Sequence, residues 1–222
     1  MNYLEVKKEL KKKFESFLKP LGFRSKADNQ GCSFFLNKEN SEYRFGYGIS
    51  NYYDEFYTGL FGSIGYTPIQ KIENAIFEEQ SFYDTLLLNI SEYFKSENFR
   101  FKISTFEDLN KWKSISEKFY YEFALPFFKQ YNTIESIDKL LNTHPTEKVV
   151  YLDDLGGRII AGLISAKLNQ NPKYDELRDY YKSEVESKFQ GYFMYEKCMK
   201  TINFLDNHSQ EELLNRNSAG FR

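Results

Sequence analysis

The feature that most constrains this chain is the alternation of apolar residues with polar or small residues from Ser41 to Gly65. Side chains of a β-strand point alternately to its two faces, so a period of two predicts a strand with one buried face. Two such runs flank the loop Asn51 to Glu55. The residues sharing one face are Tyr43, Phe45, Tyr47 and Ile49, followed by Phe56, Thr58, Leu60 and Ile64. We therefore predict a long antiparallel hairpin with an aromatic face that other elements must cover.

The residues before this hairpin predict a helix and the remainder of a sheet. Apolar residues three or four positions apart from Tyr3 to Leu21 predict an amphipathic helix over residues 3–19, which Pro20 and Gly22 end. Residues 23–26 and 32–36 predict two short strands around a turn. The expected fold class is therefore α+β, in which an N-terminal helix packs on an antiparallel meander sheet and a mainly helical C-terminal half follows.

The second half contains several helix boundaries that can be read from local signals. Thr105 and Asp108 match a capping box that opens a helix, and Pro126 must kink or end that helix. The further expected boundaries are an N-cap at Asn132, a helix over residues 158–168, an N-cap at Asn171, a break near Gly191, a cap formed by Ser209 with Glu212, and a frayed tail over residues 215–222. Residues 83–94 fit a helix or a strand. We favour a strand pair formed by residues 85–90 and 99–103, and a short buried strand over residues 148–152.

Length and composition define the class of protein. The chain of 222 residues is expected to form one continuous domain, with the helix and sheet in residues 1–104 and the helical half in residues 105–222. The longest apolar run, residues 86–88, is far below the roughly 20 residues that a membrane-spanning helix needs. Residues 1–14 contain no secretory signal, and Cys32 and Cys198 fit no motif. We therefore expect two free buried thiols and a cytoplasmic location.

The charge is unevenly distributed along the chain. The net charge is −2 and the pI about 5.9, which argues against a protein whose whole surface binds nucleic acid. The polar side of the first helix is nevertheless rich in lysine. Lys8, Lys11 and Lys12 are candidates for contact with an anion or a nucleic acid, although a solvated face interrupted by glutamates is the favoured interpretation.

Few residues in the sequence suggest catalysis or metal binding. His144 and His208 are isolated, so we expect no metal site, and we assign no cofactor and no catalytic residue. The most enzyme-like cluster is Asp153 and Asp154 before two glycines and Arg158, which could hold a divalent metal and a phosphate. A metal-dependent hydrolase or phosphotransfer enzyme is therefore the alternative function. The favoured interpretation is that the aspartates cap a helix.

The tip of the predicted hairpin is the main candidate for binding a partner. It contains Tyr52, Tyr53, Asp54 and Glu55, and the aromatic residues at such a tip cannot all be buried. Tyrosine offers a large rigid contact surface with a polar end, which suits protein recognition. Against this, tyrosines occur throughout the chain, 18 in all.

A combination of segments resembles a class of known proteins. The segments are Lys19–Phe23 after the basic helix, the meander, Thr105–Leu109 and Ala124–Phe128. Together they look like bacterial proteins built from a domain of unknown function, some of which resemble immunity proteins that neutralise toxins. The resemblance implies a fold and provides no catalytic residue. We predict a non-enzymatic cytoplasmic protein-binding module of immunity type, with an unidentified protein partner of basic character, no nucleic acid and no membrane span.

Overall fold

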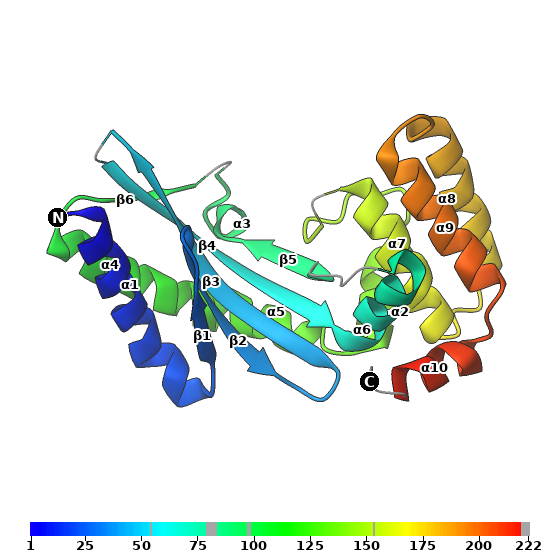
Figure 1. Ribbon diagram of the computed structural model, residues 1–222, viewed down its shortest axis with the longest axis horizontal. Helices are drawn as coiled ribbons and strands as arrows, with labels where there is room; N and C mark the ends of the chain where they lie inside the picture. The colour runs from blue at the N-terminus through cyan, green and yellow to red at the C-terminus, as the bar shows by residue number, and fades with distance from the viewer. Residues whose placement is uncertain (54, 79–83, 97–98, 153, 219–222) are drawn as a thin grey trace. The chain divides into compact units, whose positions relative to one another are not determined.

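The computed structural model describes residues 1–53, 55–78, 84–96, 99–152 and 154–218, and the chain forms two compact units (Figure 1). The first unit comprises residues 1–64 and 87–130, and the second comprises residues 65–86 and 131–222. Residues 105–130, which the sequence grouped with the helical half, belong to the first unit. In the described ranges, no helix has the length and apolar character needed to cross a membrane.

Six strands within the described residues form one antiparallel sheet. They are β1 (Arg24–Ala27), β2 (Gly31–Asn37), β3 (Ser41–Tyr52), β4 (Glu55–Tyr66), β5 (Leu86–Asn89) and β6 (Phe101–Ile103). The order is β1-β2-β3-β4-β5, and β6 also pairs with β4. The predicted long hairpin is confirmed as β3 and β4.

The prediction that residues 85–90 pair with residues 99–103 is wrong. Both segments contain a strand, but each pairs with β4, and β6 lies opposite Phe56–Thr58. β4 has 12 residues, so the edge that β3 does not use is long enough for two short strands. Residues 90–94 between them form a short helix, α3 (Ile90–Phe94).

One face of the sheet, which we call the inner face, is covered by helices of the first unit. These are α1 (Tyr3–Leu18), α4 (Phe106–Phe119) and α5 (Leu125–Gln130), all on the same side of the sheet in Figure 1. Phe14 of α1 lies 4.6 Å from Tyr47 between ring centroids, and Tyr43 stacks on Phe128 at 4.8 Å. The predicted amphipathic helix on the sheet is therefore confirmed, although Leu21 does not share its buried face and is 38% exposed.

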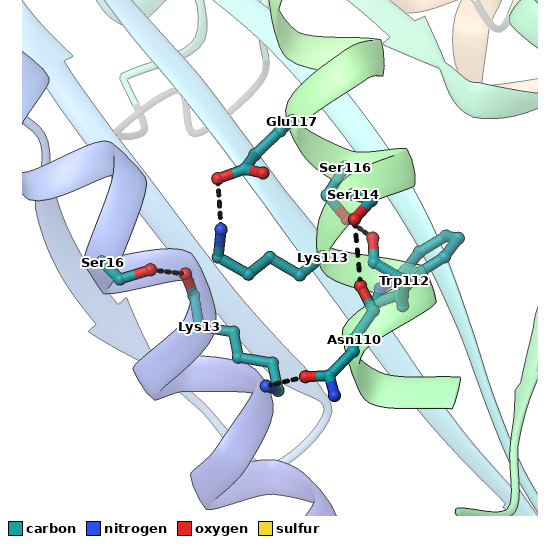
Figure 2. Close-up of polar contacts among 8 residues, drawn as sticks. All are labelled: Lys13, Ser16, Asn110, Trp112, Lys113, Ser114, Ser116 and Glu117. Atoms are coloured by element: carbon teal, nitrogen blue, oxygen red, sulfur yellow. Dashed lines mark hydrogen bonds and ion pairs between the residues drawn. The ribbon is translucent and has the colours of Figure 1, made fainter. Parts of the chain in front are cut away.

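α1 and α4 also contact each other through polar side chains (Figure 2). Lys13 Nζ donates a hydrogen bond to Asn110 Oδ1 at 2.7 Å, which joins the two helices. Within α4, the hydroxyl of Ser116 donates to the carbonyl of Trp112 at 2.7 Å. Ser116 therefore lies fully buried without an unpaired hydroxyl.

Pro126 does not end the helical path, but the α-helix changes to a π-helical turn directly before it. The Thr105–Asp108 capping box is confirmed at the start of α4, and a π-helical turn over Tyr120–Ala124 connects α4 to α5. In this turn the N–H of Leu125 donates to the carbonyl of Tyr120. A proline in an α-helix collides with the carbonyl four residues earlier. The wider turn before Pro126 moves that carbonyl and accommodates the ring.

The second unit is helical around one central element. Its helices are α2 (Thr67–Phe77), α6 (Ile134–Asn142), α7 (Leu155–Leu168), α8 (Tyr174–Lys188), α9 (Phe193–Asp206) and α10 (Gln210–Ser218). α7 contacts α2, α6, α8, α9 and α10. Its buried small residues, including Ala161, Gly162 and Ala166, allow this close approach. The mainly helical second half is therefore confirmed.

Several boundaries in the second unit differ from the prediction. Residues 148–152 are not a strand, and Val150 is 51% exposed. Thr133, not Asn132, caps α6, with Ser136 completing the capping box. The Gly191 break is confirmed, with φ of +83°, and so is the pairing of Ser209 with Glu212. α10 includes residues 215–218, which the sequence assigned to a frayed tail.

Asn171 is not the N-cap of α8, although its side-chain oxygen accepts from the Lys173 N–H at 2.9 Å just before the helix. α8 begins at Tyr174, while the Asn171 amide donates to the buried carboxylate of Asp138 at 2.9 Å. The amides of Asn142 and Asn169 donate to the same carboxylate at 2.6 and 2.7 Å. Three amides therefore satisfy a carboxylate that is only 3% exposed, and this tertiary network determines the position of Asn171.

Candidate binding site at the hairpin tip

The tip of the β3–β4 hairpin presents two tyrosines to solvent. β3 ends at Tyr52 and β4 begins at Glu55, while Asp54 lies outside the described residues. Tyr52 is 51% exposed and Tyr53 is fully exposed, at 101%. Tyr53 also has a φ of +50°, in the left-handed region that favours glycine or asparagine. The predicted tip residues that are described therefore lie together at the surface.

Side chains from β6 and the residue before it brace this tip. Arg100 Nη1 donates to the Tyr52 hydroxyl at 3.3 Å, which lowers the pKa of Tyr52 because the cation favours the phenolate. The Glu55 carboxylate pairs with Lys102 and accepts from the Tyr57 hydroxyl at 2.6 Å. These contacts lower the pKa of Glu55, and donation to a carboxylate raises the pKa of Tyr57.

The sequence prediction missed Arg100 and Lys102, which lie about 50 residues from the tip. One sequence signal could have found them, because both alternate with Phe99 and Phe101 in a strand pattern. Alternation places the two cations on the same face of β6. It does not reveal that β6 pairs with the start of β4.

A hollow of about 270 Å³ lies beside the tip on the outer face of the sheet, opposite the helices. We call it the outer-face hollow. Its floor includes Gly48 of β3 and Gly59 of β4, and its walls include Tyr57, Phe61, Phe99 and Arg100. All of these residues belong to the first unit. The tip and the hollow therefore share Tyr57 and Arg100.

The three candidate lysines of α1 differ in exposure and in their partners. Lys8 and Lys12 are exposed, while Lys11 Nζ lies 3.8 Å from Glu15 Oε1. Glu15 also pairs with Lys19 at 2.9 Å and accepts from Ser25, and these contacts lower the pKa of Glu15. No second element contributes to a site with Lys8, Lys11 and Lys12 in the described contacts.

Asp154 and Arg158 are used inside the second unit, while Asp153 lies outside the described residues. Asp154 is the N-cap of α7, and its carboxylate accepts from the Gly157 N–H at 2.7 Å. Arg158 is 4% exposed and donates to the carbonyls of Leu141, His144 and Glu147. These carbonyls lie at and beyond the end of α6, where a cation complements the helix dipole. Arg158 lines the cavity described below, and its guanidinium N–H groups are used in these backbone contacts.

A larger cavity of about 540 Å³ lies beside this cluster. Its walls include Lys148, Asp154, Tyr180, Glu184 and Lys188. Glu184 and Lys188 form an ion pair with each other. Within the described ranges, no group of three histidine, cysteine or acidic residues is placed to bind a metal ion.

The remaining nucleophile candidates are buried or isolated. Cys32 and Cys198 are free, and burial raises their pKa values to about 11 and about 12, so both thiols stay protonated. His208 Nδ1 lies 2.8 Å from the carbonyl oxygen of Phe204, and His144 Nδ1 lies 3.9 Å from Glu147 Oε1. These groups do not assemble into a nucleophile and base pair.

Comparison of the chain with protein-family models, with curated proteins and with solved structures finds no match.

Proposed function

We propose that this chain is a non-enzymatic protein-binding module, of the cytoplasmic immunity type, which recognises its partner through the tip of the β3–β4 hairpin. The observation that carries the proposal is Tyr53, a fully exposed aromatic residue with a positive φ. A non-glycine residue in the left-handed region costs roughly 1–2 kcal/mol. The two-residue connection between β3 and β4 requires a positive φ, but glycine or asparagine would meet that requirement at lower cost, and the tyrosine ring lies in solvent.

The residues around Tyr53 favour a role in partner binding over the alternative that Tyr53 is an exposed residue without a role. Tyr52 forms an edge-on contact with Tyr57, at 6.2 Å between ring centroids, and is held by Arg100. Glu55 is held by Lys102. These contacts hold the side chains of Tyr52 and Glu55 in place, which lowers the entropic cost of binding for these two residues. Exposed tyrosines on a rigid support are typical of binding hot spots.

The experiment compares the wild-type chain with a Tyr52→Ala/Tyr53→Ala variant. The wild-type chain captures its partner from a cell extract, the partner is identified and purified, and its affinity for each chain is measured by calorimetry. Hot-spot residues contribute about 2 kcal/mol or more, so we expect at least a roughly 30-fold weaker affinity for the variant. An unchanged affinity would refute the proposed role of the tip.

Two further variants separate recognition from stability. Tyr53→Gly removes the ring but suits the positive φ, so it should fold at least as stably as the wild type while binding weakly. Tyr121→Ala is the matched control, because this tyrosine is also 51% exposed, lies in the first unit and is not at the tip. It should bind like the wild type.

A further inference from the structure

The glycines of β2, β3 and β4 differ in the space beside them. A Cβ added to Gly31 would lie 2.0 Å from the carbonyl oxygen of Tyr47, and one added to Gly46 would lie 2.7 Å from that of Cys32. Packing therefore requires glycine at both positions. Gly48 and Gly59 differ, since an added Cβ would meet only a single carbonyl oxygen, at 3.9 and 3.8 Å respectively.

Neither Gly48 nor Gly59 is required by its backbone conformation. The glycines with positive φ in the described ranges are Gly22 and Gly191. Glycine inside a strand weakens it, by up to about 1 kcal/mol relative to a β-branched residue, and often marks a place where a ligand approaches the backbone. A side chain at Gly48 or Gly59 would thus fit and stabilise the sheet, but it would fill the floor of the outer-face hollow.

Part of the wall of the hollow is built by Ser91, Phe99 and Arg100, which follow β5 in the chain. The Phe99 N–H donates to the Ser91 hydroxyl at 3.2 Å, and the Phe99 ring stacks on Phe94 at 4.0 Å between centroids. The other rings at the hollow are Tyr57 and Phe61. Polar residues also line the hollow, among them Ser50, Asn89, Ser91 and Arg100. An open floor beside aromatic rings suits a flat ring, and these polar groups suit a polar neighbour of that ring.

The charges on the outer face differ in sign from those of the whole chain. Strand pairing places Arg24, Lys26, Arg44, Lys102 and Glu42 on this face, and alternation along the chain adds Arg100 and Glu55. These strand positions alone have a net charge of +3. The full chain has a net charge of −2. Electrostatic complementarity therefore favours an acidic group beside the hollow, next to Arg100.

We propose that the outer-face hollow accepts an aromatic side chain from an acidic segment of the protein partner, with a neighbouring carboxylate of that segment pairing with Arg100. This inference rests on the proposed protein-binding function and replaces the basic partner expected from the sequence with an acidic one. A protein is favoured over nucleic acid because Glu42 and Glu55 interrupt the cations of this face, and phosphate binding depends on summed positive charge.

The test uses defined probes and the full chain. The first probe is a short capped peptide with one tryptophan flanked by glutamates, the second has lysines in place of the glutamates, and the third is single-stranded oligothymidylate. Binding is followed by backbone amide NMR shifts. We expect the acidic peptide to bind, with shifts centred on Gly48, Gly59 and Phe99, and the basic peptide to bind at least about tenfold more weakly.

The decisive variants place a side chain on the floor of the outer-face hollow. Gly48→Val and Gly59→Val should keep the fold and weaken binding of the acidic peptide at least about tenfold, and the Ala variants serve if a Val variant does not fold. Asn37→Val is the matched control, at the exposed end of β2 on the same face. Equal affinity of the filled and wild-type chains, tighter binding of oligothymidylate than of the acidic peptide, or no peptide binding would each overturn the inference.

The two proposals can fail separately. If the Tyr52→Ala/Tyr53→Ala variant loses the partner while the filled variants keep it, the tip is the binding site and the hollow is not. If the filled variants lose both peptide and partner while the tip variant keeps them, the hollow binds without the tip.

Discussion

Replacing Arg158 with methionine should destabilise the second unit substantially. The side chain is 4% exposed, and its guanidinium donates to three carbonyls in the last turn of α6 and in the segment after it. Methionine has a similar length and fills most of the space, but it donates no hydrogen bond. The variant therefore tests whether the hydrogen bonds of Arg158, rather than its bulk, stabilise this region.

The expected change in the free energy of unfolding follows from the hydrogen bonds that each carbonyl oxygen loses. Leu141 O still accepts from the Tyr181 hydroxyl at 3.2 Å, and His144 O still accepts from the Glu147 N–H at 3.1 Å. Hydrogen bonds from charged donors contribute about 1.5–3 kcal/mol each. Removing a buried cation recovers part of its desolvation cost. We therefore expect a loss of about 3 kcal/mol in the free energy of unfolding.

The measurement is urea denaturation followed by circular dichroism, with amide hydrogen exchange to locate the effect in α6 and α7. A loss of this size should lower the urea midpoint by roughly 1–2 M. Arg178→Met is the matched control, because Arg178 pairs with three exposed aspartates on the surface, at 2.9 to 3.5 Å, and should cost at most about 1 kcal/mol. An Arg158→Met midpoint equal to that of this control would refute the reasoning.

Two further predictions concern ionisable groups. The lowered pKa of Glu15 means that its contacts stabilise the fold above the ordinary carboxyl pKa, and that this stability is lost as the pH falls through the lowered value. Glu15→Gln should therefore cost about 0.5–1 kcal/mol at neutral pH and nothing at about pH 2, measured by denaturation at both pH values. At about pH 8, Ellman's reagent should react with neither Cys32 nor Cys198 in the native chain and with both in urea, since burial raises both pKa values. Rapid labelling of the native chain would contradict this.

Local signals in the sequence were sufficient for the elements that depend on nearby residues. The alternation in residues 41–65 predicted β3 and β4, and the Thr105–Asp108 pair predicted the start of α4. Neighbouring signals of equal strength could not be ranked. Asn132 and Thr133 are both good N-caps, and the position of the buried residues Ile137 and Leu141 decides between them.

Long-range partners could not be predicted. Local signals do not reveal that β5 and β6 share an edge of β4, or that the Asn171 amide donates to Asp138. Arg158 next to two aspartates suggested phosphate chemistry because the carbonyls that occupy it lie 11 to 17 residues earlier in the chain.

The candidate site was predicted only in part, for the same reason. The tip could be predicted because its tyrosines lie in a turn. The hollow depends on Phe99 and Arg100 lying beside β3 and β4, which are 40 to 50 residues earlier in the chain. Gly46 and Gly48 also look equivalent in the sequence. The structure separates them, because one lies under the Phe61 ring and the other faces open space.

The pairing of β4 with both β5 and β6 has a consequence for self-association. An unpaired strand edge can recruit another chain and begin aggregation, a particular hazard for a protein in which 18% of the residues are aromatic. Along one side of the sheet, β5 and β6 occupy hydrogen-bonding groups of β4, so the edge there consists of strands of only four and three residues. On the other side the sheet ends in β1, which has four residues and carries Arg24 and Lys26. Because this edge strand is short and positively charged, we do not expect a second molecule to pair with it and extend the sheet.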